Sequence, residues 1–527
     1  MTLPANIADL LSASAARTPD APAVTDRTAT LSYAELATRA GHMADQLSTA
    51  GITPGDRVAV IVDKEVAVVA AIFGCFLAGA VLVPVNPQLK ALQLGYILSD
   101  SGARMLLAGP KRAAILQDID PNLAKTALLD ADLSPVSDAP MPGPRAPAPG
   151  FEDLPLATLF YTSGSTGLPK AVACTHANVL AGATSVSTYL ENTAQDVILA
   201  VLPLSFDAGF SQLTTAFHVG AHVILRDYLL PADIARPCRD HGVTGITGVP
   251  AIWAAALRAK WDDTARHNIR YVANTGGHLS YQRICELTDL FPNARPYPMY
   301  GLTEAFRSSY LHPDHVHSKQ GSMGQAIPGA TLVVVDEMGQ DCAPDQPGEL
   351  VHAGPTVAAG YWNNPEETAK RFRPAPPALT ARGITGTVVY SGDLVRQDAD
   401  GFLFYETRMD GQIKISGNRI SFAEIEEVAL AHPEVRACAA GGRKVDLAQD
   451  PELLLFVESD GGEDVAEALM AQLRAELPGF SVPSRIFTRP RLILNANGKY
   501  DVKQMIAEHC NTAEHCDTAQ GNARGTD

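Results

Sequence analysis

A run rich in hydroxyl residues and glycine, residues 162–170, constrains this chain more than any other segment. Its nine positions hold four hydroxyl residues, two glycines and a lysine. Glycine tolerates positive φ and lets successive backbone N–H groups point into one concavity, while the hydroxyls donate further hydrogen bonds and the lysine adds positive charge. The apolar residues 158–161 before the run are expected to form a strand, and a helix is expected to begin at His176. The run is therefore predicted to hold phosphate.

The run departs from the common P-loop pattern GxxxxGK[ST]. Gly164 and Lys170 have the right separation, but Pro169 replaces the second glycine and Ala171 follows the lysine. This departure disfavours a P-loop kinase. A plain glycine–serine turn would explain a short piece of the run but not the whole of it. The residues expected to contact phosphate are Thr162, Ser163, Gly164, Ser165, Thr166, Gly167 and Lys170.

Four further motifs follow downstream. They are Tyr-Gly-Leu-Thr-Glu at 300–304, Tyr-Ser-Gly-Asp-Leu at 390–394, a basic stretch with glycines at 408–420, and Asn-Gly-Lys-Tyr-Asp at 497–501. Together with the hydroxyl-rich run, these motifs resemble, in content and order, those of the adenylate-forming superfamily. That superfamily comprises acyl-CoA synthetases, luciferases and adenylation domains of nonribosomal peptide synthetases. The resemblance covers about residues 5–506.

The length and the order of the elements predict the fold class. A chain of 527 residues is too long for one hydrophobic core, so two or more domains are expected. Strand-like and helical runs alternate over residues 57–107, which indicates βαβ units with parallel strands. Residues 330–336 and 348–352 suggest antiparallel strands. The resemblance implies an α/β fold, with α/β subdomains and a β-rich subdomain in a large N-terminal domain, and a small mobile α+β C-terminal domain.

The expected domain boundaries come from the same resemblance and from local composition. The N-terminal adenylating domain is expected to span 1–407 and the mobile C-terminal domain 408–508, with the hinge at Asp410. Residues 133–150 contain six prolines and are expected to be an extended linker between subdomains. Residues 509–527 are polar and without pattern, which is typical of a disordered tail.

The amino-acid composition limits which classes of partner are expected. A hydrophobic content of 46% with 19% charged residues is typical of a globular protein, and a net charge of −17 argues against nucleic acid or an anionic membrane surface as a partner. The eight cysteines are scattered without a CxxC pair, which favours reduced thiols in the cytoplasm. The first residues lack the basic region of a signal peptide. A cytoplasmic protein is therefore expected.

The uncharged stretch 66–85 is long enough for a membrane span. Gly74, Gly79 and Pro84 interrupt it, and β-branched residues gather at its end. A buried helix ending near Gly79, followed by a buried strand over 80–85, is the prediction.

Two groups of histidines and cysteines raise the alternative of a zinc site. His509, Cys510, His515 and Cys516 lie in the predicted tail, and their spacing matches no common zinc module. His312, His315 and His317 are expected to lie in a polar loop.

The chemistry implied by the resemblance is activation of a carboxylic acid. A carboxylate oxygen is a poor leaving group, so the acid attacks the α-phosphorus of ATP, giving an acyl-adenylate and pyrophosphate. Such a step needs charge neutralisation and in-line positioning more than a protein nucleophile. ATP and Mg²⁺ are the expected cofactors.

The resemblance also implies a role for each residue. Lys499 would bridge the substrate carboxylate and the α-phosphate, Thr303 would contact the α-phosphate, and Glu304 would hold Mg²⁺. Asp393 would accept the ribose hydroxyls, with Tyr300, Arg408 and Lys414 also at the nucleotide. Gly417 and Lys414 would face the site after domain rotation. Two departures stand out, since Ser391 replaces the usual threonine and Glu406-Thr407 replaces the common glycine before Arg408.

The acid-binding residues are predicted from two runs, 202–210 and 300–307. Asp207 after Phe206 resembles amino-acid-activating members, in which an aspartate pairs with the substrate ammonium; a structural aspartate bonded to the backbone is the alternative. Arg307 could bind a second carboxylate or pair with Asp207. The expected substrate contacts are Phe206, Asp207, Phe210, Gly276, Gly277, Gly301, Phe306 and Arg307.

Taken together, the two runs resemble two stand-alone groups: carrier-loading β-amino-acid adenylation enzymes and acyl-CoA ligases associated with exosortase-type gene clusters. An amino acid or similar polar acid, passed to the phosphopantetheine thiol of a separate carrier protein, is the prediction. No carrier-attachment signal follows Lys499. An AMP-forming acyl-CoA ligase acting on a fatty or other organic acid is the alternative. An oxidative luciferase-like reaction and a non-enzymatic ATP sensor are disfavoured.

Overall fold

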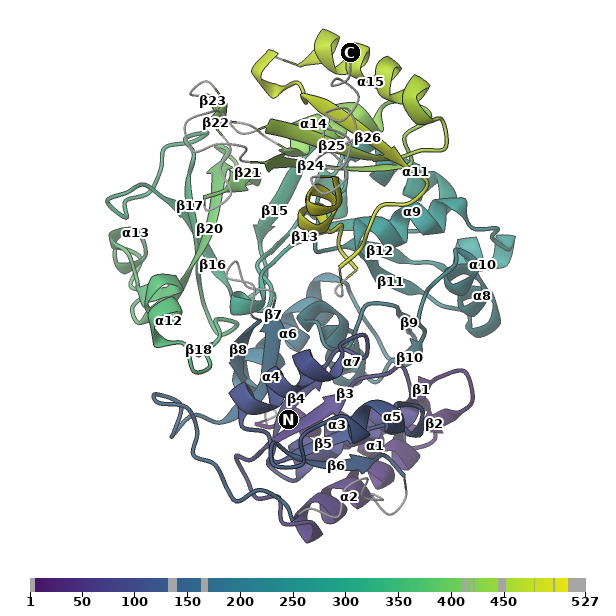
Figure 1. Ribbon diagram of the computed structural model, residues 1–527, viewed down its shortest axis with the longest axis vertical. Helices are drawn as coiled ribbons and strands as arrows, with labels where there is room; N and C mark the ends of the chain where they lie inside the picture. Colours follow the sequence, from purple (N-terminus) through teal and green to yellow (C-terminus); the bar gives the residue numbers. More distant parts are fainter. Residues whose placement is uncertain are drawn as a thin grey trace, which may run out of the picture.

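The computed structural model describes residues 5–130, 140–162, 169–409, 414–415, 418–419, 422–443, 452–477, 479–495 and 498–509. Figure 1 shows a large N-terminal part, coloured purple to green, beneath a small C-terminal body in yellow-green. The large part contains two sheets, and the small body has a sheet of its own. The mixed α/β fold with a large and a small domain, as predicted, is confirmed.

Among the described residues the first sheet has seven strands, and the hydroxyl-rich run lies between two of them in the sequence. In spatial order the strands are β18 (Gly360–Tyr361), β8 (Lys170–Thr175), β7 (Leu156–Thr162), β4 (Val81–Val85), β3 (Arg57–Ile61), β5 (Met105–Ala108) and β6 (Lys125–Leu128). The strands from β7 to β6 are parallel, as predicted, whereas β8 and β18 are antiparallel to their neighbours. The run therefore joins two antiparallel strands, and α6 (His176–Tyr189) begins only after the second.

Helices of the N-terminal segment pack on this sheet and on one another. They are α1 (Ala8–Arg17), α2 (Tyr33–Thr49), α3 (Val66–Leu77), α4 (Ala91–Ser101) and α5 (Ala113–Gln117). Ser32 and Glu35 form a capping box that starts α2. Helix α3 is the first half of the uncharged stretch, and ten of its residues are buried. Within the described residues no helix is long and apolar enough to cross a membrane.

The second sheet begins with parallel strands. These are β10 (His222–Leu225), β9 (Val197–Ala200), β11 (Gly245–Gly248), β12 (Tyr271–Asn274) and β13 (Arg295–Tyr300), extended at one edge by β1 (Pro22–Thr25) and β2 (Thr30–Ser32). The connecting helices are α7 (Asp207–Val219), α8 (Ala232–His241), α9 (Pro250–Arg258), α10 (Asp263–Asn268) and α11 (Tyr281–Leu290). In parallel α/β sheets ligands bind beyond the carboxyl ends of the strands, which directs attention to the loops after β9, β11, β12 and β13.

The same sheet continues as an antiparallel, β-rich part, drawn in green in Figure 1. Its elements are β14 (Ser309–Tyr310), β15 (Ser322–Ala326), β16 (Thr331–Val335), β17 (Gly348–Ala353), β19 (Phe372–Pro374), β20 (Thr387–Gln397) and β21 (Leu403–Arg408), with α12 (Pro365–Arg371) and α13 (Pro377–Thr380) beside them. The antiparallel pairing of β16 with β17 confirms the strands predicted at 330–336 and 348–352.

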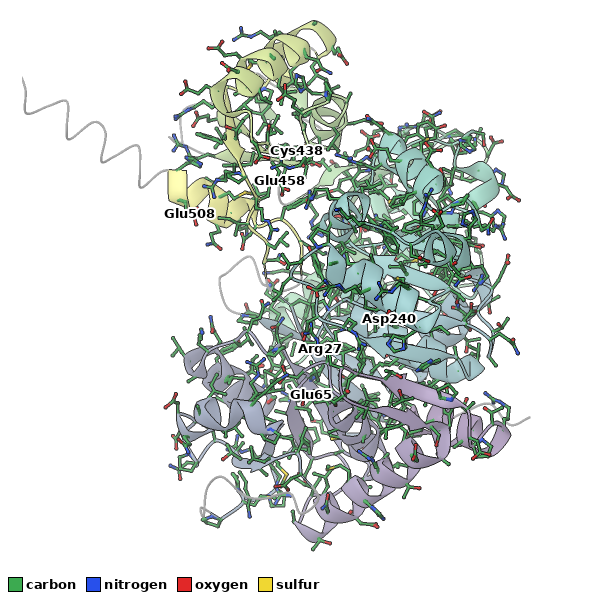
Figure 2. All side chains as sticks on the ribbon, turned by 90° about the vertical axis from the view of Figure 1, so that its right-hand side faces the viewer. Arg27, Glu65, Asp240, Cys438, Glu458 and Glu508 are labelled. Atoms are coloured by element: carbon green, nitrogen blue, oxygen red, sulfur yellow. The ribbon has the colours of Figure 1, made fainter. Side chains whose placement is uncertain are left out.

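The small domain packs two helices on a three-stranded sheet. Its elements are α14 (Phe422–Leu430), β24 (Ala437–Arg443), β25 (Glu452–Glu458), α15 (Gly462–Glu476) and β26 (Arg485–Arg489), preceded by the hairpin of β22 (Lys414–Ile415) and β23 (Asn418–Arg419). Leu455, Leu469 and Leu473 lie in its core and are fully buried. Figure 2 shows Cys438 and Glu458 on the side of this domain that faces the large one. The predicted hinge Asp410 and residues 510–527 of the predicted tail lie outside the described residues. His509, the first residue of that tail, is described and stacks on Phe487.

The described part of the proline-rich segment, residues 140–150, has neither helix nor strand, as expected. Arg104 donates a hydrogen bond to the Pro142 carbonyl, and Arg57 donates one to the Arg145 carbonyl. These contacts hold the segment along the first sheet, where it connects β6 to β7. The segment therefore links two strands of one sheet, so the prediction of a linker between subdomains is wrong.

Candidate active site

A cavity of about 650 Å³ lies at the carboxyl ends of β12 and β13 and reaches the small domain. The glycines after β12 form part of its wall, and Gly276 has φ +74°, which favours glycine. The structure brings these predicted residues to its wall: Thr162, Phe206, Asp207, Gly276, Gly277, Tyr300, Gly301, Thr303, Glu304, Arg307, Asp393, Arg408 and Lys499. Residues from six distant parts of the sequence thus meet at one place.

Lys499 enters this cavity from the small domain. The Asn495 N–H donates to the Lys499 carbonyl, the Gly498 N–H donates to the Asn495 carbonyl, and the Asn495 side chain accepts from the Lys499 N–H. The ammonium lies 5.3 Å from the centre of the Phe206 ring. A Cβ atom at Gly276 would lie 3.0 Å from Lys499 Cε, so glycine makes room for the lysine. Burial lowers the pKa of Lys499, and the nearby Asp207 opposes this effect. A substrate carboxylate is therefore a suitable partner for the ammonium.

Asp207 begins α7 and is part of a buried ion pair. Arg307 Nη1 lies 3.2 Å from Asp207 Oδ2, and the Thr303 hydroxyl donates to Asp207 Oδ1 at 3.2 Å. Both charged side chains are only 4% exposed. Burial raises the pKa of Asp207, while Arg307 and Lys499 counteract it. Of the two partners predicted for Arg307, the structure shows Asp207.

Gly209 allows the chain to place Asp207 at the cavity wall. A Cβ atom at Gly209 would lie 2.0 Å from the Pro203 carbonyl oxygen, so any side chain would collide with backbone. The close approach of this first turn to the loop after β9 brings Asp207 to the cavity wall.

The nucleotide end of the cavity is built by β13, β20 and β21. The Tyr300 hydroxyl donates to Asp393, and Arg408 Nη1 lies 3.2 Å from the other oxygen of that carboxylate. Asp393 and Arg408 face each other across the β20–β21 pair. Burial and the adjacent Asp393 raise the pKa of the Tyr300 hydroxyl, which keeps it a donor. Such a carboxylate, held at a cavity wall, can accept the two hydroxyls of a ribose.

Glu304 is the residue that fits a magnesium ion. It lines the cavity next to Thr303, and one carboxylate oxygen accepts from the Tyr361 hydroxyl. The described residues contain no cluster of three or more histidine, cysteine, aspartate or glutamate side chains that could hold a metal, and this includes His312, His315 and His317. A single carboxylate suits Mg²⁺, which prefers oxygen ligands and uses substrate phosphates and water for most of its sites.

The structure places three of the predicted contact residues away from the cavity wall. Phe210 lies one turn further along α7 and packs in the core against Phe76 and Phe160. Phe306 has φ +55°, which turns its ring into the core at Gly182, where a Cβ atom would lie 2.3 Å from it. Neither side chain reaches the cavity.

Lys170 is the third predicted contact residue that lies away from the cavity wall. Its ammonium pairs with Glu367 on α12 and does not line the cavity. Of the other predicted residues, Ser163, Gly164, Ser165, Thr166, Gly167, Asp410 and Gly417 lie outside the described residues, as does the side chain of Lys414.

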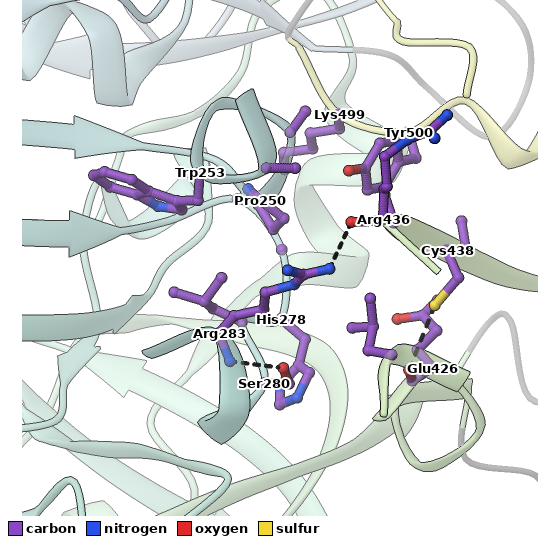
Figure 3. Close-up of a pocket in the computed structure, with 18 of the residues that line it drawn as sticks. Pro250, Trp253, His278, Ser280, Arg283, Glu426, Arg436, Cys438, Lys499 and Tyr500 are labelled. Carbon is purple, nitrogen blue, oxygen red and sulfur yellow. Dashed lines mark hydrogen bonds between the residues drawn. The ribbon is translucent and has the colours of Figure 1, made fainter. Parts of the chain in front are cut away.

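A second cavity, of about 250 Å³, extends from the first between the two domains. Figure 3 shows Pro250 and Arg283 of the large domain opposite Cys438, Glu426 and Tyr500 of the small one. Arg283 Nη2 donates to the backbone carbonyls of Val435 and Arg436, at 3.2 and 2.7 Å. Sequence reasoning missed this cavity, because both its walls and its contacts exist only once the two domains meet.

Glu426 lines both cavities, and the Ala440 N–H donates to its carboxylate at 2.8 Å. Burial raises the pKa of Glu426 from 4.5 to about 7. The folded protein therefore keeps a proton that the unfolded chain releases, and the unfolding free energy falls as pH rises from about 4.5 to 7. We expect Glu426→Gln to be about 2–3 kcal/mol more stable than the wild type at pH 8 and equally stable near pH 4.

Urea unfolding at pH 4, 6 and 8 measures this difference. The exposed neighbour Glu427 provides the control, because Glu427→Gln removes the same charge without a buried carboxyl. If Glu426→Gln raises the unfolding free energy by the same amount at every pH, the raised pKa of Glu426 is contradicted.

The residues above can be compared with known families. A family model described as "AMP-binding enzyme" matches residues 11–362, and one described as "AMP-binding enzyme C-terminal domain" matches residues 424–499. The chain belongs to the AMP-binding enzyme family. This confirms the resemblance to the adenylate-forming superfamily and places the chain among AMP-forming ligases.

Three individual matches illustrate the breadth of this family. Phosphinothricin tripeptide synthetase PhsB of Streptomyces viridochromogenes is 33% identical over 94% of this chain and 41% of its own length. Feruloyl-CoA synthase of Amycolatopsis sp is 31% identical over 91% of this chain and 94% of its own length. The structure of a benzoate CoA ligase from Burkholderia xenovorans LB400 superposes with a TM-score of 0.80 at 26% identity, covering 95% of this chain and 99% of that one. The chain spans less than half of PhsB and 6% of malpinin synthetase of Mortierella alpina.

Proposed function

We propose that the protein activates a carboxylic acid with ATP and then passes the acyl group to a thiol. In the first step a substrate carboxylate oxygen attacks the α-phosphorus, the bond to pyrophosphate breaks, and an acyl-adenylate forms. In the second step a thiolate attacks the acyl carbon and AMP leaves with the bonding electrons. The acceptor we propose is the phosphopantetheine thiol of a separate carrier protein.

The position of Lys499 carries this proposal. A lysine from the small domain lies in the main cavity close enough to Asp207, Glu304 and Asp393 for their charges to act on it. An ammonium between an acid pocket and a nucleotide pocket can neutralise charge that develops on the attacking and leaving oxygens. A Mg²⁺ ion held by Glu304 would supply further charge neutralisation on the phosphate oxygens.

We propose further that the acid carries an amino group. Asp207 is the anionic group of the acid pocket, and an ionised carboxylate has about four acceptor positions. Thr303 and Arg307 each use one of them, so an ammonium can still bind. A buried carboxylate with a raised pKa also gains from an added cation.

The thiol acceptor is supported by the second cavity. Its walls come from both domains, and it shares Gly276, Gly277 and Lys499 with the main cavity. A cavity between the two domains that shares residues with the main cavity suits a flexible arm that ends in a thiol. Coenzyme A is the alternative acceptor, and the match to feruloyl-CoA synthase over 94% of that enzyme favours it.

Pyrophosphate release across a panel of acids tests the proposal. The panel contains β-amino acids, α-amino acids, aryl acids and medium-chain fatty acids, each with ATP and Mg²⁺. We expect release with amino acids and at least about tenfold less with the matching acid that lacks the amine, since a hydrogen bond to a charged group contributes about 1.5–3 kcal/mol. Release with aryl or fatty acids alone would contradict amine recognition and favour the coenzyme A alternative. Release with none of the acids would contradict acid activation itself.

A further inference from the structure

Lys170 and Glu367 form an ion pair between β8 and α12. The Lys170 ammonium contacts one oxygen of the Glu367 carboxylate, and Lys370 binds the other at 2.6 Å. The Asn364 side chain caps α12 by accepting from the Glu367 N–H, which holds this residue in the first turn. These hydrogen bonds lower the pKa of Glu367 to about 2. The positive charge of Lys170 is therefore balanced within the protein and is not directed at the cavity.

Tyr361 connects this ion pair to Glu304. Strand β18 pairs with β8 so that Tyr361 lies opposite Val172, and Figure 1 shows these two strands side by side. The Lys170 ammonium lies 5.8 Å from the centre of the Tyr361 ring. At its far end the buried tyrosine donates its hydroxyl proton to Glu304 Oε1. The Ala358 N–H also donates to the Glu304 carbonyl, at 2.8 Å, so the segment before β18 holds the backbone as well.

We propose that Tyr361 positions the Glu304 carboxylate for a divalent ion, and that the Lys170–Glu367 pair positions Tyr361 instead of binding phosphate. The inference rests on the proposed function, because it assigns a role at the phosphate end of that site. Tyr361 and Glu367 do not line the cavity. They are positioning residues that act through Glu304.

Two features of the contact support a positioning role. A hydrogen bond to Oε1 fixes the rotation of the carboxylate, which is otherwise broad about its last bond. Tyr361 is only 5% exposed, so the packing around its ring fixes where its hydroxyl lies. Partners that orient a metal-binding carboxylate typically change metal affinity or activity by about 10–100-fold when removed.

The first test is the affinity for ATP measured by calorimetry, with Mg²⁺ and with EDTA. We expect Tyr361→Phe to weaken binding of ATP with Mg²⁺ about tenfold and to leave binding in EDTA unchanged. Tyr33→Phe is the matched control, because Tyr33 is equally buried and donates its hydroxyl proton to the Ala221 carbonyl far from the site. Glu304→Gln should remove the Mg²⁺-dependent gain, and adding Tyr361→Phe to it should change nothing further.

The second test reverses the ion pair. We expect Lys170→Glu and Glu367→Lys to weaken Mg²⁺-dependent ATP binding about tenfold each, and the double variant to return to within about threefold of the wild type. A double variant as weak as Lys170→Glu alone would mean that Lys170 contacts phosphate and would overturn the inference. A Tyr361→Phe variant that melts like the wild type and binds ATP with Mg²⁺ as tightly as the wild type would overturn it too. If the wild type binds ATP equally tightly with Mg²⁺ and with EDTA, both the proposed function and the inference are overturned.

Discussion

Replacing Lys499 with alanine should lower the rate of adenylate formation by about 10²–10³-fold. The ammonium is the one cation that the small domain places between the acid pocket around Asp207 and the nucleotide pocket around Asp393, among the described residues that line the main cavity. Removing it takes charge stabilisation from the transition state, whereas ATP keeps its contacts on the large domain. The KM for ATP should therefore change by only a few-fold. Single-turnover pyrophosphate release measures the rate directly.

A control and a second half-reaction make this prediction specific. Lys503 lies four residues further on and is exposed, so Lys503→Ala should leave the rate unchanged. A chemically prepared acyl-adenylate, offered with a thiol acceptor, bypasses the first step, and Lys499→Ala should use it at close to the wild-type rate. Equal losses in both half-reactions would mean that Lys499 is a structural residue and not a charge placed for adenylation.

The parts of the site that sequence reasoning placed in the cavity share a simple physical basis. Tyr300 ends β13, which is parallel to β12, and Thr303 and Glu304 follow it. The carboxyl ends of parallel strands meet at one edge of a sheet. Asp393 lies in a long strand whose neighbour carries Arg408, so the β-ladder alone brings them together. The position of each of these side chains depends on strand residues close to it in sequence or directly opposite it in the ladder. For this reason the sequence could predict that they meet.

Three predicted residues lie away from the cavity because of contacts that no local sequence pattern reveals. Phe210 lies on nearly the same helix face as Asp207, but one turn further along α7, where the side chains around it are Phe76 and Phe160 of the core. Phe306 depends on a positive φ at a residue that rarely adopts it. Lys170 was expected at phosphate, but its partner Glu367 lies 197 residues away in sequence. The sequence shows the charge of each residue and gives no sign that they meet.

The second cavity could not be predicted for a related reason. One wall belongs to α9 and α11 of the large domain and the other to α14 and β24 of the small domain. Arg258 of the large domain lies 3.0 Å from Glu458 of the small one, and Arg283 donates to two small-domain carbonyls. Such contacts between domains follow from surface shape, which hydrophobic periodicity does not encode.

Replacing Asp207 with alanine should lower the unfolding free energy by about 3–5 kcal/mol. The change leaves the Arg307 guanidinium buried, 4% exposed, without its counter-charge, and breaking a buried pair by removing one partner costs this much. Removing both charges is far less costly, so Asp207→Ala combined with Arg307→Met should regain most of the loss. Urea unfolding of the two variants measures the difference. The exposed pair of Asp341 and Arg382 is the matched control, and Asp341→Ala should cost less than about 1 kcal/mol.

The stable double variant then separates stability from recognition. It folds without an anionic group at position 207, so any loss of activity with amino acids reflects the missing partner for the amine. We expect kcat/KM for amino acids to fall about 10–100-fold, and that for acids lacking an amine to change much less, since a hydrogen bond between charged groups contributes about 1.5–3 kcal/mol. If the double variant activates amino acids as the wild type does, Asp207 serves only to pair with Arg307. The acid pocket would then select its substrate by shape, and the search for the substrate would move to acids without an amine.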